Sequence, residues 1–311
     1  MIEIIRYEEK HKNDWNNLID ISKNGTFLFN RNYMDYHSDR FIDFSLLVYR
    51  KEKLVAVFPA NINDNVIYSH QGLTYGGLIY VNKLSVVDVL GIFESIIHYY
   101  KNNNIRIIVY KAIPYIYSNY PSQEDLYALF RNRAQIIGCN ISSAICQKEK
   151  MKFSELRRRG IKKAKKNDIL CAMSDNFESF WNVLTANLGA KYDVKPVHSI
   201  DEIKYLHSIF PQNIKLYIAE KQSEVLAGVV AFISRNIIHI QYISASPEGK
   251  ELGALDLLFD YLINTEYKDF DYFDFGQSTE QMGYYLNENL LFQKEGFGGR
   301  GVVYNVYEIK V

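Results

Sequence analysis

A glycine-bearing turn between a strand and a helix gives this sequence its clearest pattern for anion binding. Residues 237–244 read as a strand, and residues 246–249 (Ser-Pro-Glu-Gly) follow as a turn. A helix then opens with Lys250, Gly253 and Ala254, and its apolar residues recur at spacings of three and four. Because backbone N–H groups at such a helix start point at anions, these three residues are candidate phosphate contacts. A tight turn without a ligand would explain the same glycine.

Polar side chains also follow the next strand, where α/β sheets commonly place ligand contacts. The strand 270–275 ends in a glycine, and Gln277 and Glu280 come directly after it. Glu280 is a candidate general base, and Gln277 a candidate substrate contact. Arg300 could pair with a carboxylate or phosphate, or cap the last hairpin. No Ser-His-Asp order or Cys-His pair stands out, so covalent catalysis is not indicated.

Two further stretches carry groups of chemical interest. His70 precedes a glycine-rich segment with Tyr75, and an imidazole can transfer protons near neutral pH. We take His70 as a second candidate catalytic residue, with a structural histidine as the alternative. The basic run 157–166 could hold phosphates of a tRNA, a nucleotide-sugar or a lipid-linked intermediate. Because no aromatic residues interrupt this run, a solvated helix face is the favoured interpretation.

The composition indicates a globular chain with no strong charge bias. The 311 residues suffice for two domains, and 48% are hydrophobic. Lys and Arg total 36, as do Asp and Glu, so the whole molecule is no obvious binder of nucleic acid or membrane surfaces. Cys139, Cys146 and Cys171 follow neither a metal-ligand nor a disulfide spacing. No apolar run reaches the length of a membrane span, and we expect a soluble cytoplasmic protein without a metal site.

The order of expected elements repeats along the chain. Each half reads strand, helix, helix, hairpin, strand, helix, strand, with the halves joined near residues 147–168. We therefore predict an α/β (α+β) fold of two tandem units, residues 1–150 and 151–311. Each unit should hold a mixed, mostly antiparallel sheet flanked by helices.

This order resembles a tandem pair of GNAT-type N-acetyltransferase units, as in the FemAB/FemX group of acyltransferases. The likeness covers essentially the whole chain and depends on the order and spacing of short motifs. These are the segments 70–77 (HQGLTYGG), 157–164 (RRRGIKKA), 195–199 (KPVHS), 272–276 (YFDFG) and 292–298 (FQKEGFG).

The resemblance implies an enzyme that moves an acyl group to an amine. It places the acceptor in a cleft between the units, with Tyr75 lining it, and the donor in the second unit. Lys195 and His198 flank the proline of an expected loop at this cleft and are candidate substrate contacts. Direct transfer in related units needs no enzyme nucleophile, which agrees with the absence of a covalent motif here.

The sequence departs from the family pattern in two respects. tRNA-dependent members of the group often carry a coiled-coil arm. This sequence has no sustained heptad repeat, so we expect that arm to be missing. The pyrophosphate loop keeps Lys250 and Gly253 but loses the small residue at its last position, where Leu255 stands. The missing arm favours a donor of the acyl-CoA type over aminoacyl-tRNA, whereas the altered loop argues against tight coenzyme A binding. The expected acceptor is an amino sugar or cell-envelope precursor. The alternatives are a tRNA-dependent aminoacyltransferase of peptidoglycan precursors and a catalytically inert module that binds a glycan or a partner protein.

Overall fold

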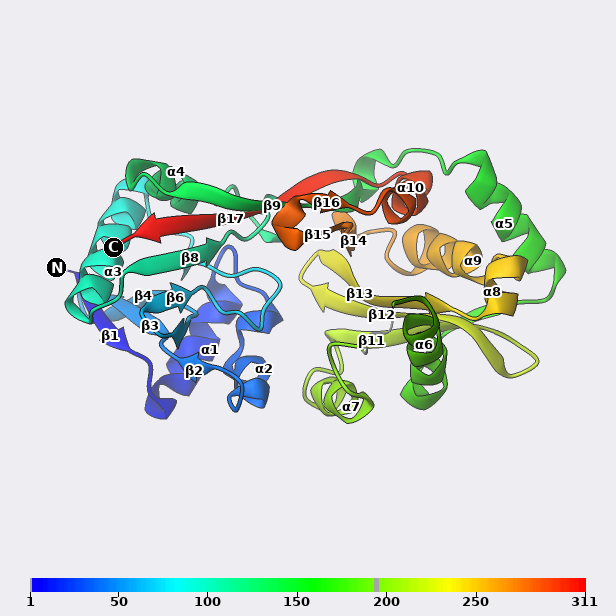
Figure 1. The fold of residues 1–311 in the computed structure, drawn as a ribbon, viewed down its shortest axis with the longest axis horizontal. Coiled ribbons are helices and arrows are strands. Elements are labelled where there is room, and N and C mark those ends of the chain that lie inside the picture. The colour runs from blue at the N-terminus through cyan, green and yellow to red at the C-terminus, as the bar shows by residue number, and fades with distance from the viewer. Residues whose placement is uncertain (1, 193–195) are drawn as a thin grey trace. The chain divides into compact units, whose positions relative to one another are not determined.

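The computed structural model describes residues 2–192 and 196–311, which form two compact units (Figure 1). Unit 1 comprises Met1–Ile141, Thr279–Leu286 and Val303–Val311, and unit 2 comprises Ser142–Ser278 and Asn287–Val302.

Unit 1 contains two sheets and their helices. The first sheet has the strand order β1-β3-β4-β7, and the second contains β17-β8-β6-β5-β2. In the second sheet β6 runs parallel to β8, whereas its other pairings are antiparallel. The elements are β1 (Ile2–Arg6), α1 (Lys12–Ile21), α2 (Arg31–Met34), β2 (Ile42–Asp43), β3 (Leu46–Arg50), β4 (Lys53–Phe58), β5 (Asn61–Asn63), β6 (Val66–Tyr68), β7 (Ile79–Tyr80), α3 (Val86–Asn102), β8 (Ile107–Lys111), α4 (Glu124–Arg131), β9 (Gln135–Cys146), β15 (Thr279–Glu280), β16 (Tyr285–Leu286) and β17 (Arg300–Lys310).

Helix α3 supplies much of the core of unit 1. It begins with a capping box, in which Ser85 Oγ accepts from the N–H of Asp88 and the Asp88 carboxylate accepts from the N–H of Ser85. Its apolar side chains recur at helical spacing and pack in one cluster with the strands, as do residues of α4. The buried residues of α3 are Val89, Ile92, Phe93, Ile96 and Tyr100.

Unit 2 is built on one sheet with the order β10-β11-β12-β13-β14-β9. Its pairings are antiparallel except for the parallel pair β13 and β14. The elements are α5 (Glu155–Lys166), β10 (Leu170–Ser174), α6 (Phe177–Tyr192), α7 (Ile200–Ile209), β11 (Ile214–Lys221), β12 (Glu224–Ser234), β13 (Ile237–Ala245), α8 (Pro247–Leu252), α9 (Ala254–Tyr261), β14 (Tyr272–Gln277) and α10 (Glu288–Gly296).

Helices cover both faces of the central strand β12. Ala227 and Val229 belong to the cluster that contains the apolar residues of α9. Gly228, which points to the other face, leaves room for the ring of Phe180 from α6. Figure 1 shows α9 and α6 on opposite sides of these strands, with α5 packed outside α9. The predicted fold class, two units with mostly antiparallel sheets flanked by helices, is confirmed.

Each unit is completed by a strand from the other half of the sequence. The end of β9 pairs with β14, where Cys146 lies opposite Tyr272. The end of β17 pairs with β8, where Val306 lies opposite Lys111. The sequence pattern assigns the last strand of the chain, β17, to the second unit, whereas its end pairs with β8 of unit 1. A local pattern shows that a strand exists but not where it pairs.

The candidate anion-binding segment, residues 246–254, differs in local structure from the sequence prediction. Residues 246–249 were expected to be a turn, but helix α8 already begins at Pro247. Ser246 caps this helix, since its Oγ accepts from the N–H of Gly249, and proline suits the first helical position. Gly253 ends α8 with a φ of 77° and separates it from α9. No helix in the described part of the chain is long and apolar enough to cross a membrane.

Substitution of Gly253 tests how closely the junction of α8 and α9 packs against α5. A Cβ at this position would lie 2.5 Å from the carbonyl oxygen of Gly160 in α5, and the positive φ disfavours other residues. We expect Gly253→Ala to lower the free energy of unfolding by about 2–4 kcal/mol. The measurement is chemical denaturation followed by tryptophan fluorescence, to which Trp181 of the same unit contributes.

Gly189 provides the matched control. It lies exposed in α6, and a Cβ there would meet nothing within 4 Å. We expect Gly189→Ala to leave the unfolding free energy unchanged or to raise it by about 0.5–1 kcal/mol, because alanine favours helices. Equal losses in both variants would contradict the close approach of α5 and Gly253.

Candidate functional site

The parallel strands β13 and β14 separate within unit 2. Their register runs from Ile237 opposite Tyr272 to His239 opposite Asp274 and then stops, although both strands continue. A bulge at Gln241 accompanies the separation, because the pairing of β13 with β12 skips this residue. Bulges bend a strand and redirect its side chains. The two strands therefore open a space directly beyond His239 and Asp274.

A buried carboxylate lies where the strands separate. Asp274 is fully buried, and its Oδ2 lies 2.8 Å from Nδ1 of His239. Its other oxygen accepts from Ser142 Oγ of β9 and from the N–H of Gly276 at 3.1 Å. Because a carboxylate accepts hydrogen bonds, it holds the proton of the neutral imidazole on Nδ1. Nε2 is then the basic nitrogen of His239.

A buried lysine clamps the end of β14. Lys294 of α10 donates from Nζ to the carbonyl oxygens of Gly276 at 2.7 Å and Gln277 at 2.8 Å, and to Ser278 Oγ at 2.9 Å. Burial lowers the pKa of Lys294 to about 8, although the nearby Asp274 carboxylate acts in the opposite direction. Its three hydrogen bonds fix the backbone that leaves the strand pair, where Gly276 has a φ of 77°.

A cavity of about 560 Å³ adjoins the separated strands. A narrow apolar recess that includes Ile240, Phe275 and Lys294 shares Ile243, Leu290 and Gln293 with this cavity. This recess holds only about 10 Å³ and includes Ile240 and Phe275, the residues that directly follow His239 and Asp274. The cavity is lined by Arg157, Asn187, Leu188, Ile243, Ser244, Ala245, Gly249, Lys250, Gly253, Leu255, Asp256, Asn289, Leu290, Phe292 and Gln293.

Two cations lie at this cavity. Lys250 of α8 is exposed and donates to the side-chain oxygen of Asn187. Arg157 of α5 is held by Asp256, whose Oδ1 lies 2.7 Å from its Nη1. Nε of Arg157 is buried and has no hydrogen-bond partner among the described residues. Burial of Asp256 raises the pKa of that carboxyl, and Arg157 partly offsets the rise. This part of the cavity can neutralise an anionic group.

The predicted phosphate contacts fall partly on this cavity. Lys250 and Gly253 line it, whereas Ala254 is fully buried. The N–H of Gly253 donates to the carbonyl of Gly249 inside α8. The glycine therefore has a packing role against α5, and its contact with a phosphate stays a prediction.

Other predicted residues of unit 2 have structural partners of their own. His198 is buried, and its Nδ1 lies 2.5 Å from the hydroxyl of Tyr242 on β13. Gln277 accepts from Lys294 through its carbonyl. Arg300 is exposed and donates to the carbonyl of Gly299 at 2.6 Å. Lys195 lies outside the described residues.

The remaining candidates belong to unit 1. Tyr75 is 3% exposed, and its hydroxyl donates to Thr26 Oγ1 at 3.3 Å. Glu280 is exposed on the short strand β15. His70 is buried with a φ of 68°, and its ring lies 5.2 Å from that of His37 in a stacked arrangement. Nδ1 of His70 and Nε2 of His37 have no hydrogen-bond partner among the described residues. Their roles in substrate binding or catalysis stay predictions.

The three residues around the strand opening are not among the sequence-predicted site residues, although each carries a signal in the sequence. His239 and Asp274 are polar residues inside apolar strand patterns, and Lys294 belongs to the 292–298 motif. A buried polar residue in such a pattern must have a partner, which points to a site or a structural network. In the described part of the chain, no three His, Cys, Asp or Glu side chains gather as metal ligands.

Comparison with protein families matches a domain that contains His239, Asp274, Arg157 and Lys250. Residues 152–284 match the family described as "Acetyltransferase (GNAT) domain". A search of the curated proteins finds no match.

Solved structures extend the likeness to the whole chain. The structure of FemX superposes with a TM-score of 0.70 at 9% identity and covers 99% of this chain and 97% of its own. The C-terminal domain of a putative lysylphosphatidylglycerol synthetase from Agrobacterium fabrum gives 0.57 at 10% identity, with 83% and 81% covered. A tandem GNAT protein from the clavulanic acid biosynthesis pathway gives 0.51 at 8% identity, with 100% and 98% covered.

The matched domain and the fold support an acyltransferase of the GNAT type. Residues 152–284 match a GNAT acetyltransferase domain, and the chain as a whole has the fold of FemX. The prediction of a FemAB/FemX-like enzyme of the N-acyltransferase class is thus confirmed at the level of domain family and fold.

The paired imidazoles of unit 1 predict a dependence of stability on pH. Burial lowers the pKa of His37, and burial together with nearby cationic groups lowers the pKa of His70 well below its usual value. The unfolded chain therefore binds protons more readily below about pH 6.5, and stability falls as the pH drops through that range. At about pH 5.5, His70 alone accounts for a loss of up to about 1.4 kcal/mol relative to neutral pH.

His70→Asn removes this titration while keeping a residue that tolerates positive φ. We expect its unfolding free energy to change less than that of the native protein between about pH 7 and 5.5. His98→Asn, at an exposed position on α3, is the control and should preserve the native pH dependence. An unchanged pH dependence in His70→Asn would show that His70 is accessible to protons in the folded state.

Proposed function

We propose that this chain transfers an acyl group from an acyl-CoA-type thioester to an amine of an amino sugar or cell-envelope precursor. The observation that carries the proposal is the opening between β13 and β14 inside the matched acetyltransferase domain. His239 and Asp274 lie where these two strands stop pairing, and farther along β13 the residues Ile243, Ser244 and Ala245 line a cavity with two cations. A donor with a reactive thioester at one end and phosphates at the other has the matching chemistry.

Lys250 and Arg157 support the position of the donor phosphates. Both border the cavity: Lys250 is exposed and pairs with an amide, whereas Arg157 forms an ion pair with Asp256 and keeps a buried Nε–H without a partner among the described residues. The volume of about 560 Å³ is in the range of small-molecule sites.

His239 supports the chemical step. The amine nitrogen attacks the thioester carbonyl, the new C–N bond forms, and the C–S bond breaks as the thiol leaves. His239 removes the proton that the amine loses and returns a proton to the thiolate. Asp274 orients the ring and stabilises its protonated form, so that the base is ready when the amine arrives.

The separated strand supports stabilisation of the oxyanion. Beyond His239 the edge of β13 no longer pairs with β14, and we propose that an amide group on this edge contacts the oxyanion. Fixed backbone N–H donors in a site shielded from water stabilise negative charge that develops on a carbonyl oxygen. The Lys294 clamp keeps β14 from closing over this edge.

Donor binding provides one test of the proposed function. We expect coenzyme A or an acyl-CoA to raise the thermal midpoint of the protein, since a ligand at about 100 times its Kd adds about 2.7 kcal/mol. Lys250→Gln should weaken this binding about fivefold, because one partly exposed charge contact with a phosphate is lost. Lys204→Gln, at an exposed cation on α7 away from the cavity lining, is the control and should bind like the native protein.

The same screen distinguishes the alternatives. A rise of the thermal midpoint only with aminoacyl-tRNA would show that the donor is an ester and not a thioester. Binding of nucleotide-sugars alone, without any turnover, would favour an inert binding module. The proposed donor site is wrong if Lys250→Gln and Lys204→Gln bind an identified acyl-CoA equally well.

The catalytic step provides another test of the proposed function. We expect His239→Gln to lower kcat by about 10²–10⁴-fold, because the amine then loses its proton without a positioned base. The donor-induced thermal shift should persist, since His239 lies away from the two cations. A variant with native kcat would exclude His239 as the base.

A further inference from the structure

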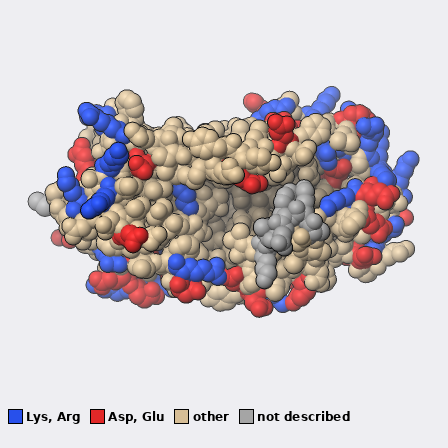
Figure 2. Space-filling view, viewed as in Figure 1, with Lys and Arg blue, Asp and Glu red and all other residues tan. Residues whose placement is uncertain are grey.

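Helix α5 carries a dense cationic face that the acyl-transfer site does not use. Residues 148–166 contain ten Lys and Arg against two Glu, in a chain whose charges balance overall. Arg157 turns inward to Asp256, while the other cations of the helix are exposed. Figure 2 shows Lys and Arg side chains gathered over the region where Figure 1 places α5. The exposed cations of the helix are Arg158, Arg159, Lys162, Lys163, Lys165 and Lys166.

Acidic neighbours neutralise this face only in part. Arg158 pairs with Glu155 at 2.7 Å, Lys165 with Asp260 at 3.4 Å and Lys163 with Glu251 at 3.8 Å, all with substantial solvent exposure. Surface pairs of this kind contribute little to stability and exchange readily with other anions. No ion pair within the described residues involves Arg159, Lys162 or Lys166. The face therefore retains a large positive potential for a partner.

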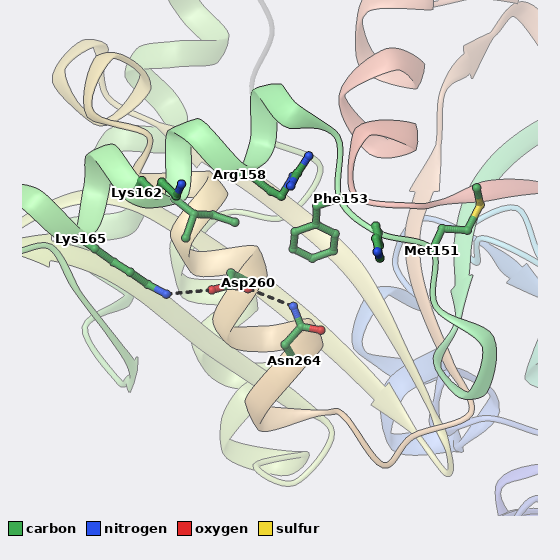
Figure 3. Close-up of a pocket in the computed structure, with 9 residues that line it drawn as sticks. Met151, Phe153, Arg158, Lys162, Lys165, Asp260 and Asn264 are labelled. Atoms are coloured by element: carbon green, nitrogen blue, oxygen red, sulfur yellow. Dashed lines mark hydrogen bonds and ion pairs between the residues drawn. The ribbon is translucent and has the colours of Figure 1, made fainter.

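An apolar recess of about 450 Å³ lies among these cations. Figure 3 shows Arg158, Lys162 and Lys165 projecting along it, with Phe153 beside Arg158. The other residues of its lining are Met151, Lys152, Ile161, Asp260 and Asn264. A cationic rim around an apolar floor matches a ligand that joins a phosphate to a hydrocarbon.

An exposed apolar side chain extends the recess outward. Met151, which lines the recess, is 50% exposed. Phe153, an aromatic residue of the lining, packs edge-on against Phe297 with the ring centres 5.3 Å apart. Base stacking by RNA needs exposed ring faces, whereas a bilayer needs cations beside exposed apolar groups. The arrangement therefore favours a lipid surface over a nucleic acid.

We propose that the basic face of α5 docks unit 2 on an anionic lipid bilayer. Arg158, Lys162 and Lys165 bind the phosphate of one lipid, and the recess takes the beginning of its acyl chains. Long cationic side chains suit this position, because their apolar stems pack on the recess while their charges reach the headgroups. The proposal is independent of the acyl-transfer chemistry and involves no residue of the donor cavity.

The test is co-sedimentation of the full chain with vesicles of phosphatidylcholine alone or mixed with phosphatidylglycerol. We expect binding only to the mixed vesicles, with a strong decrease as salt is raised. Each cation near an anionic leaflet contributes roughly fivefold, so the triple variant Arg158→Gln/Lys162→Gln/Lys165→Gln should bind roughly a hundredfold more weakly. Met151→Ser should weaken the binding that persists at high salt.

The matched control changes the same number of charges elsewhere. Lys53→Gln/Lys83→Gln/Lys101→Gln alters three exposed lysines of unit 1 and should bind vesicles like the native protein. Circular dichroism confirms that both triple variants are folded. Equal weakening in both triple variants, equal binding to both kinds of vesicle, or tighter binding to a short RNA than to the mixed vesicles would each overturn the proposal. Acyl transfer to a soluble amine should be unaffected by the α5 variant, which separates this test from that of the enzyme activity.

Discussion

The buried carboxylate of Asp274 is the constraint on which the site depends. A charge removed from water must be paired and hydrogen-bonded, and here the partners come from β13, from β9 and from the backbone of β14 itself. Satisfying Asp274 thus joins three strands at one point. The side chain of His239 reaches this carboxylate at the last paired position of the two parallel strands. The separation of the two parallel strands begins from this fixed point.

The part of the cavity that contains Arg157 and Lys250 depends on how closely α5 and α9 approach each other. Gly253 and Gly160 remove the side chains that would otherwise separate α9 from α5. The short distance lets Arg157 reach Asp256 and lie at the cavity, while Lys250 borders it from α8. A donor that spans a reactive carbonyl and an anionic end needs both groups at fixed separations. Packing of small residues is therefore as important to this arrangement as the charged groups themselves.

Sequence patterns predicted the order of elements and the fold class because apolar periodicity survives in a single sequence. The start of α8 was read as a turn, since Ser-Pro-Glu-Gly suits turns and helix N-termini equally well. His239 and Asp274 are 35 residues apart, and only the parallel pairing of their strands brings them together. Lys294 was visible as part of a motif, but its burial depends on the backbone that surrounds it. Gly253 was recognised as special, whereas its partner in α5 could not be inferred from local sequence.

The exchange of strands β9 and β17 constrains how the chain is made. Residues 303–311 complete the sheet of unit 1, yet the ribosome synthesises them after all of unit 2. The edge of β8 must therefore stay unpaired, or be protected, while the second half of the chain is translated. An exposed strand edge attracts other strands, so this interval is the period when the nascent chain is most prone to aggregate. Unit 2 already has its β9 segment when its own strands emerge, and it can close first.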